Sequence, residues 1–248
     1  VGFDMEDLWR LYHEPFPAFL RPFAETPPMA RLRDVGTNCG CEYTDFPLYR
    51  HTKPYSRFDH SVGVALILWH FTGSPRQTVA GLLHDIATPV FAHVVDFLNG
   101  DHLRQESTEA RTAAVIRQSP ELLALLKRER LTVEDVADYH RYPLADNPSP
   151  QLSADRLEYT LGNLWHYGFL SLDQLAAFYD DLAVGGDEQG RQELAFQTPE
   201  TASAFARAAL DTSRVYVSDE DRFAMQALAD LLKDALARGV LSTEDLYT

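Results

Sequence analysis

The sequence predicts an all-α fold, with one helical domain over residues 1–248. Two observations favour this class. Hydroxyl–proline pairs typical of helix starts recur along the chain, and the segments between them carry apolar residues at helical spacing, as in the run from Met225 to Leu236. Strand patterns are sparse, and no internal repeat or linker divides the sequence. We therefore expect a single domain built mainly from helices.

Ser or Thr before proline marks the expected helix starts, because the hydroxyl caps the first turn and proline suits the first helical position. Four pairs fit this pattern: Ser74–Pro75, Thr88–Pro89, Ser119–Pro120 and Thr198–Pro199. Capping-box spacings mark further starts. These are Ser74 with Gln77, Thr132 with Asp135, Ser171 with Gln174 and Ser218 with Asp221.

Three helical segments carry the candidate functional residues. The segment Asp59 to Phe71 has an apolar stripe that includes His60 and so directs it toward the core. A second apolar helix ends at His84 and Asp85. The segment Pro150 to Trp165 places Asp155 on its inward face, where a carboxylate is costly unless a cation or a hydrogen-bond donor meets it.

The remaining segments are assigned by their composition. Gly36 to Pro54 is rich in Tyr, Pro, Cys and Gly and is expected to be an irregular connection. The glycines at 185, 186 and 190 predict a turn, either the tip of a small hairpin near 185–196 or a loop between helices. We expect the ligand-bearing core to span about 55–165 and the C-terminal helices 171–238.

Charge restricts the class of partner. The formal net charge of −15 argues against an extended nucleic-acid partner, because phosphate backbones are bound by clustered Lys and Arg. A small anionic molecule remains compatible if cations gather locally. Arg50, Lys53, Arg57 and Arg156 are candidates for such a cluster.

The cysteines and the apolar runs predict the compartment. Cys39 and Cys41 are too close for an ordinary disulfide and too few for a structural zinc site, so we expect free thiols in a reducing environment. No apolar run approaches the ~20 residues that span a bilayer, and the N-terminal residues do not resemble a signal peptide. These features predict a cytoplasmic protein without a membrane partner.

His60, His84, Asp85 and Asp155 form a candidate four-ligand site for a divalent metal ion. Imidazole and carboxylate donors together suit iron, manganese, zinc, nickel or cobalt and do not select among them. Each residue also has an ordinary alternative. Either histidine could be a hydrogen-bonded core residue, and Asp155 could pair with an arginine or cap a turn.

Three motifs carry a resemblance to a known family: Tyr55 to Val64, Leu82 to Asp85 and Ser153 to Tyr159. They resemble the ordered His, His-Asp and Asp signature of the HD superfamily of metal-dependent phosphohydrolases, and are most similar to its deoxynucleoside triphosphate triphosphohydrolase branch. The resemblance extends from Met29 to Leu236. It implies an all-α HD-type domain, one divalent ion (Fe, Mn, Zn, Ni, Co or Mg) held by the four candidate ligands, a small phosphorylated substrate such as a nucleotide, and a homo-oligomer.

The resemblance also implies roles for single residues. Arg57 matches an arginine that contacts phosphate, Tyr159 a tyrosine near the sugar, and Asp96 an acidic residue of the catalytic relay. Two positions depart from the branch, because Thr88 and Gln105 stand where it carries relay histidines. A general acid contributes about 10²- to 10⁴-fold to rate, so these departures put triphosphate hydrolysis itself in question.

His93, His140 and Arg156 complete the set of candidate site residues. His93 lies three residues before Asp96 and is a candidate catalytic residue, with a structural role behind the metal as its alternative. His140 is a candidate for the substrate entrance, the alternatives being a solvated loop position or a second metal site. Arg156 is a candidate phosphate contact, and the alternative for Arg57 is an ion pair with Asp59 or another carboxylate.

The sequence as a whole predicts a phosphohydrolase that uses metal-activated water on a nucleotide or another small phosphate ester. Three alternatives stay open. One is a phosphomonoesterase or phosphodiesterase with a non-nucleotide substrate. Another is a catalytically impaired sensor that binds metal and nucleotide. The third is oxygen-dependent chemistry at an iron pair, which would need further histidine ligands from His93, His102 or His140.

Overall fold

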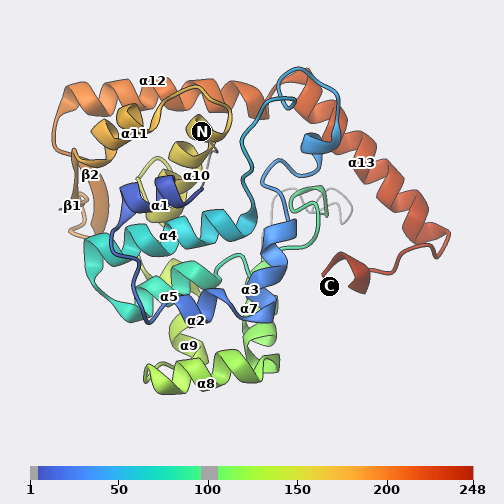
Figure 1. The fold of residues 1–248 in the computed structure, drawn as a ribbon, viewed down its shortest axis with the longest axis horizontal. Helices are drawn as coiled ribbons and strands as arrows, with labels where there is room; N and C mark the ends of the chain where they lie inside the picture. The colour runs from blue at the N-terminus through green and yellow to red at the C-terminus, as the bar shows by residue number, and fades with distance from the viewer. Residues whose placement is uncertain (1–4, 96–105, 248) are drawn as a thin grey trace.

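Helices dominate this computed structural model, which describes residues 5–95 and 106–247 (Figure 1). The α-helices in this part of the chain are α1 (Met5–Tyr12), α2 (Arg21–Ala24), α3 (Pro27–Ala30), α4 (Arg57–Thr72), α5 (Pro75–Leu83), α7 (Glu106–Gln118), α8 (Pro120–Arg128), α9 (Val133–Val136), α10 (Ala154–His166), α11 (Leu172–Tyr179), α12 (Pro199–Tyr216) and α13 (Asp219–Ala237). Short 3₁₀ turns are η1 (Arg31–Asp34), η2 (Cys41–Tyr43), η3 (Tyr139–Arg141) and η4 (Glu244–Leu246). The predicted all-α class is confirmed.

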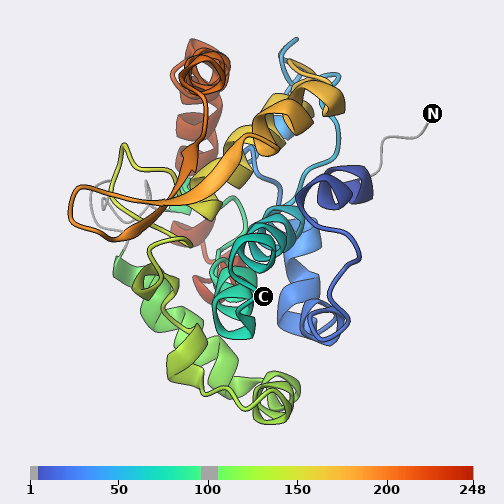
Figure 2. The ribbon, with the colours of Figure 1, turned by 90° about the vertical axis from the view of Figure 1, so that its left-hand side faces the viewer.

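One hairpin accompanies the helices. Strands β1 (Leu182–Gly186) and β2 (Gln192–Phe196) pair antiparallel, with Leu182 opposite Phe196 and Gly186 opposite Gln192. This confirms the small hairpin expected near 185–196, although β1 begins slightly before that range. Figure 2 shows the hairpin projecting from the side of the helical body. The Leu194 N–H of β2 donates to the Leu152 carbonyl at 3.2 Å, in the segment that precedes α10.

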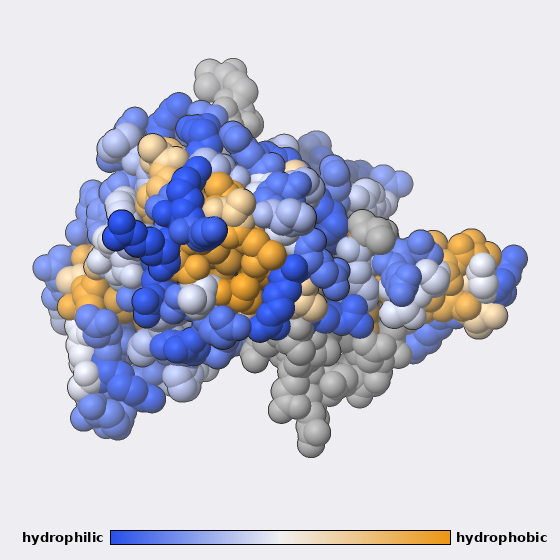
Figure 3. All heavy atoms as spheres, turned by 90° about the horizontal axis from the view of Figure 1, so that it is seen from below, coloured by the Kyte–Doolittle hydropathy of each residue, from blue (hydrophilic) through white to orange (hydrophobic). Residues whose placement is uncertain are grey.

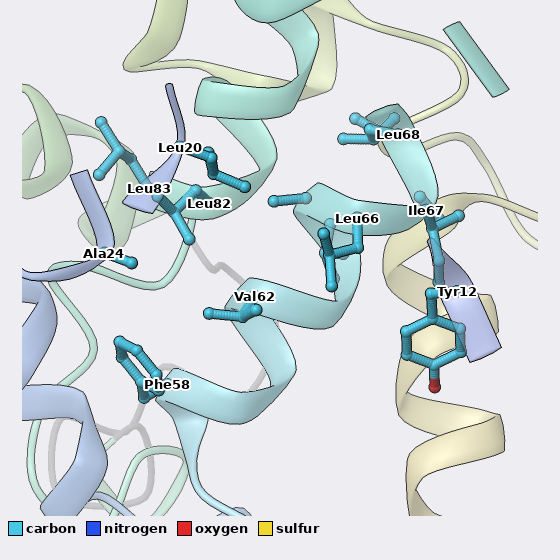
Figure 4. Packing of buried hydrophobic residues seen from close by; sticks show 14 of the residues in the cluster. Tyr12, Leu20, Ala24, Phe58, Val62, Leu66, Ile67, Leu68, Leu82 and Leu83 are labelled. Carbon is cyan, nitrogen blue, oxygen red and sulfur yellow. The ribbon is translucent and has the colours of Figure 1, made fainter. Parts of the chain in front are cut away.

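Helix α4 lies at the centre of the fold because its sequence is apolar around most of its circumference. It packs against α1, α5 and α10. Val62 and Leu66 of α4 belong to the same buried cluster as Leu82 and Leu83 of α5 (Figure 4). The central helix therefore fixes the relative positions of the segments that carry His60, His84 and Asp155.

A second buried cluster joins α13 to the irregular connection around η2. Ala224, Met225 and Ala229 of α13 lie in this cluster with Cys41 and Tyr49. Figure 3 shows apolar side chains at the end of the molecule where α13 finishes in Figure 1. There Leu231 and Val240 are each 67% exposed.

Three of the four expected proline starts are confirmed, because helices begin at Pro75, Pro120 and Pro199. Thr198 does not cap its helix, since its hydroxyl contacts Asp181 instead. The start expected at Thr88–Pro89 is wrong.

Thr88 fails as a helix cap for a physical reason. Its hydroxyl donates to Asp85 Oδ1 at 2.9 Å, three residues back along the chain. The chain then passes through left-handed conformations at Phe91 (φ 65°) and Ala92 (φ 42°), which a helix does not tolerate. The backbone at these two residues therefore rules out a helix that starts at Pro89.

The capping boxes give a mixed result. Thr132 with Asp135 and Ser171 with Gln174 form both reciprocal hydrogen bonds. Ser74 and Ser218 accept from the expected backbone N–H groups but receive no reciprocal bond, and the Asp221 carboxylate accepts from Tyr49 instead. A further box, not predicted, joins Ser56 to Asp59 at the start of α4.

The structure also bears on the two cysteines and on the expected lack of a membrane-spanning helix. Cys39 and Cys41, which both lie in the described residues, are buried free thiols. Within residues 5–95 and 106–247, every helix is too short or too polar to cross a bilayer.

Candidate metal centre

Three of the predicted ligands meet at one point. His60 comes from the first turn of α4, His84 directly follows α5 as its C-cap, and Asp155 lies in the first turn of α10. Each residue offers one ligand atom, and these atoms all lie within 4.8 Å of one another. Side chains far apart in the sequence thus form a compact group.

His60 is buried between two carboxylates. Its Nδ1 donates to Glu158 Oε2 at 2.5 Å, and its Nε2 lies 3.0 Å from Asp155 Oδ1. Burial alone would lower the pKa of His60, but the hydrogen bonds with Asp155 and Glu158 raise it to about 10. A metal ion at Nε2 would take the place of the proton shared with Asp155.

His84 is held by the backbone of the helix that precedes it. Its Nδ1 donates to the Gly81 carbonyl at 2.7 Å, which leaves Nε2 as the available ligand atom. This Nε2 is 3.9 Å from Asp155 Oδ1, and the Tyr139 ring centroid lies 4.8 Å from that of His84. The imidazole is thus oriented toward the group before any ion binds.

Asp155 presents one oxygen to the histidines and the other to a hydroxyl. Tyr139 donates to Asp155 Oδ2 at 3.1 Å, while Oδ1 faces His60 and His84. Burial would raise the pKa of Asp155, but the hydrogen bond from His60 and the charge of His84 lower it to about 2. The carboxylate is therefore ionised, as a metal ligand must be.

Asp85, the fourth expected ligand, lies beside this group. Its Oδ2 is 3.1 Å from Arg57 Nη1 and 3.6 Å from His84 Nε2, while Oδ1 accepts from Thr88. Although burial opposes ionisation, the charges of His84 and Arg57 hold the pKa of Asp85 well below its usual value. The ion pair considered for Arg57 is thus formed with Asp85, whereas the Asp59 carboxylate accepts from the backbone N–H of Ser56, the N-cap of α4.

The donor set fits a divalent ion. Both imidazoles use Nδ1 for a fixed acceptor, which directs their Nε2 atoms to the carboxylate of Asp155. With both imidazoles neutral, as metal ligation requires, the carboxylates of Asp85, Asp155 and Glu158 outnumber the Arg57 cation in this buried region. Nitrogen and carboxylate oxygen together are typical ligands of first-row transition metals.

The metal group opens into a cavity of about 560 Å³. Five other predicted site residues line it: Arg57, Asp85, His93, His140 and Tyr159. Its wall also contains Asn38, Cys39, Tyr55, Thr88, Tyr139, Asn163, Tyr167, Tyr216, Asp221, Arg222 and Met225. The cavity therefore joins the candidate ligands to a partly aromatic chamber, which helices α4, α10 and α13 form together with the connections around residues 37–39, 84–93 and 137–140.

Two predicted residues are not found in this cavity. Arg156 points elsewhere, because its guanidinium donates to the side chain and carbonyl of Asn147 and to the carbonyl of Gln151. It supports the loop before α10 and does not line the cavity wall. Asp96 lies outside the described residues, as do His102 and Gln105.

His93 and His140 have exposed side chains that line the cavity. His140 stands between two carboxylates, 3.3 Å from Asp138 Oδ1 and 3.4 Å from Asp146 Oδ2. Its position at the surface agrees with both readings of the sequence, a solvated loop and the substrate entrance. His93 is not buried behind the metal group, contrary to its structural alternative.

Sequence reasoning missed Glu158 and Tyr139, which contact the candidate ligands directly. A signal for Glu158 was present. It follows Asp155 by three residues and so shares the inward face of α10, where a charged residue requires a partner. Tyr139 belongs to a loop, and nothing in its spacing indicated contact with Asp155.

Comparison with known families agrees with this geometry. Residues 57–161 match the family model described as the HD domain. Over this range the chain is similar to the HD domain. All four predicted ligands lie inside the matched range, as does His93. The match begins at Arg57, the first residue of α4, and ends within α10.

Two curated proteins are similar to a larger part of the chain. An uncharacterised protein of Bacillus subtilis, YdhJ, is 29% identical over 193 residues, which cover 77% of this chain and 57% of YdhJ. Metal-dependent phosphohydrolase cns2 of Cordyceps militaris is 29% identical over 167 residues, which cover 66% of this chain and 47% of cns2. The chain spans about half the length of these relatives.

Proposed function

We propose that this protein is a metal-dependent phosphohydrolase that acts on a nucleotide. The observation that carries the proposal is the opening of the His60, His84 and Asp155 group into a cavity that Arg57 also lines. A volume of about 560 Å³ suits a small molecule, since such sites commonly measure roughly 300–1,000 Å³. The HD domain and the printed name of the Cordyceps relative support the same class of reaction.

His60, His84 and Asp155 hold the ion in this proposal, with Asp85 as the fourth ligand. A bound divalent ion lowers the pKa of a coordinated water and polarises a phosphoryl oxygen. The chain prepares its ligands for that role by fixing Nδ1 of each histidine, so that Nε2 of each faces the ion. Thr88 and Arg57 hold the Asp85 carboxylate next to His84.

Arg57 binds the substrate phosphate in this proposal. Its Nη1 is occupied by Asp85, but its buried Nε has no hydrogen-bond partner among the described residues. A buried N–H donor without an acceptor is costly, and an arginine fork recognises phosphate oxygens well. The unpartnered Nε therefore supports a phosphate contact that leaves the Asp85 ion pair intact.

Proton transfer to the leaving group is assigned to His93, together with Asp96. His93 lines the cavity, whereas Thr88 is already engaged with Asp85 and has no titratable proton in the working pH range. Tyr159 and His140 line the same cavity and are assigned to the sugar and to the entrance. The aromatic wall that includes Tyr139, Tyr159 and Tyr167 favours a nucleoside, because rings and bases stack well.

Two other functions follow from particular observations. Thr88, which replaces a relay histidine of the triphosphohydrolases, favours a sensor that binds metal and nucleotide without turnover. The metal group and Arg57 recognise only a phosphoryl group in this proposal, which also suits a non-nucleotide phosphate ester processed by a phosphomonoesterase or phosphodiesterase.

One assay separates these functions. The metal-loaded protein is incubated with nucleoside mono-, di- and triphosphates and with non-nucleotide phosphate esters, and the phosphate, pyrophosphate and triphosphate released are resolved. We expect nucleotide hydrolysis that Asp85→Ala abolishes, with triphosphate as the product if the resemblance to triphosphohydrolases extends to activity. Saturable nucleotide binding without turnover would identify the sensor, and turnover of the other esters alone would identify the second alternative.

A further inference from the structure

We propose that Glu158 is a positioning residue for the metal centre, and that Tyr55 and Tyr12 act with it. In this view the three side chains lock the His60 ring so that its Nε2 faces the ion. The proposal rests on the metal site of the proposed function, but it concerns residues that do not themselves bind the ion.

The contacts of Glu158 define the network. Oε2 accepts from His60 Nδ1 at 2.5 Å and from the Tyr55 hydroxyl at 2.5 Å, while Oε1 accepts from the Tyr12 hydroxyl at 3.3 Å. Glu158 has no exposed surface. A fully buried carboxylate requires such donors, and here one of them belongs to a candidate metal ligand.

Two glycines make room for the network at the contact between α4 and α10. A Cβ at Gly63 would lie 2.5 Å from Glu158 Oε1, and a Cβ at Gly162 would overlap the Tyr55 hydroxyl oxygen. Both glycines are buried within helices, where glycine is a weaker helix former than alanine. The lack of a side chain at these two positions therefore lets Glu158 and Tyr55 fit between α4 and α10.

The network also extends the metal centre beyond the matched HD domain. Tyr12 and Tyr55 both precede residue 57, where the match begins. Tyr12 ends α1, and the Tyr179 hydroxyl of α11 donates to the Tyr12 backbone carbonyl at 2.9 Å and not to the Tyr12 hydroxyl that reaches Glu158. The N-terminal helix is thus connected to His60 through one carboxylate.

The two histidines depend on different supports. His84 donates Nδ1 to a backbone carbonyl, which no side-chain substitution removes, whereas His60 donates Nδ1 to Glu158. A carboxylate at this position orients a ligand histidine and increases its basicity, and its loss typically weakens metal binding about 10- to 100-fold. His60 is therefore the ligand that a single substitution can disorient while leaving the donor in place.

The test measures metal affinity without substrate. Wild type, Glu158→Gln, Tyr55→Phe and Tyr179→Phe are titrated with Mn²⁺ alone, and in parallel with Zn²⁺ alone, against a competing chelator. Tyr179→Phe is the matched control, because it deletes a buried hydroxyl in the same cluster that does not contact Glu158. Melting temperatures of the metal-free proteins record the structural effect of each change.

We expect Glu158→Gln to bind metal about 10- to 100-fold more weakly. Tyr55→Phe loses one hydrogen bond to the carboxylate and should bind roughly 2- to 10-fold more weakly. Tyr179→Phe should lower the melting temperature without changing metal affinity. Tyr55→Phe provides the test on its own if Glu158→Gln does not fold.

Wild-type metal affinity in both Glu158→Gln and Tyr55→Phe would overturn the positioning role, whatever happens to their melting temperatures. Equal losses of affinity in Tyr55→Phe and Tyr179→Phe would overturn it too, because they would reflect general destabilisation. The proposed function fails separately: metal binding by the wild type without hydrolysis of any phosphate ester contradicts it and leaves the role of Glu158 intact.

Discussion

Arg57 and Asp85 form an ion pair at the edge of the candidate metal centre, with Arg57 Nη1 3.1 Å from Asp85 Oδ2. Both side chains are only 14% exposed. The pair joins the residue assigned to substrate phosphate to the residue assigned as the fourth metal ligand. It holds the Asp85 carboxylate close to His84. The buried Arg57 Nε has no hydrogen-bond acceptor among the described residues.

Substitution of Arg57 tests its assignment to substrate. We expect Arg57→Ala to raise KM about 10-fold or more, because hydrogen bonds to charged groups contribute roughly 1.5–3 kcal/mol. Metal content should stay at the wild-type level, since His60, His84 and Asp155 remain. Arg57→Lys is the control that keeps the charge but loses the planar fork of the guanidinium. Its KM should lie between those of the wild type and Arg57→Ala. Stoichiometric loss of metal from Arg57→Ala would show that the arginine supports the ion instead.

Substitution of Gly63 tests the space around Glu158. The new methyl group of Gly63→Ala would overlap the Glu158 side chain, so we expect a loss of about 1–3 kcal/mol in the free energy of unfolding together with weaker metal binding. Leu66→Ala is the control, because it removes core packing from the same helix and adds no atom toward Glu158. Denaturant unfolding and metal titration of the two variants check this. Equal metal affinity in Gly63→Ala and wild type would refute the prediction.

The lowered pKa of His166 predicts how the stability of the fold depends on pH. Burial lowers the pKa of His166 to about 4, while its Nε2 accepts from Asn38 and its Nδ1 donates to the Lys53 carbonyl. Between the usual histidine value of ~6.5 and pH 4 the unfolded chain binds a proton that the folded chain does not. The contribution of this neutral histidine to stability is therefore complete above about pH 6.5 and is lost as the pH falls toward 4.

Thermal unfolding between pH 4 and pH 7 checks this prediction. The loss of stability on acidification should be less steep in His166→Gln than in the wild type. His51→Gln, which replaces an exposed histidine, is the control and should follow the wild-type slope. Parallel curves for His166→Gln and wild type would contradict the assignment.

Much of the helical fold could be predicted because its signals are local. Ser74–Pro75 and Ser119–Pro120 cap and start helices without help from distant residues. Thr88–Pro89 has the same local pattern but starts no helix, because the backbone is left-handed at Phe91 and Ala92. The sequence rule failed beside the candidate site, where the Thr88 hydroxyl also contacts Asp85.

The convergence of His60, His84 and Asp155 was predictable from inward-facing positions on three helices and from the resemblance to HD proteins. The direction in which long side chains point could not be predicted from the sequence. Arg156 lies one residue from Asp155, yet its guanidinium donates to the carbonyls of Asn147 and Gln151 in the loop before α10. The Glu158 network depends on Tyr12, which lies 146 residues away in the sequence. It also depends on Gly63 and Gly162, whose role follows from the packing of α4 against α10 and not from any local pattern.

The metal content of the purified protein tests the central claim most directly. Elemental analysis after loading with a divalent ion should give one ion per chain in the wild type and in His140→Ala, and a clear loss in His84→Ala and in Asp155→Ala. Those two variants should also lose the rise in melting temperature that a bound ion provides. Two ions per wild-type chain would point to a binuclear centre with further histidine ligands. Unchanged metal content in both His84→Ala and Asp155→Ala would contradict the account.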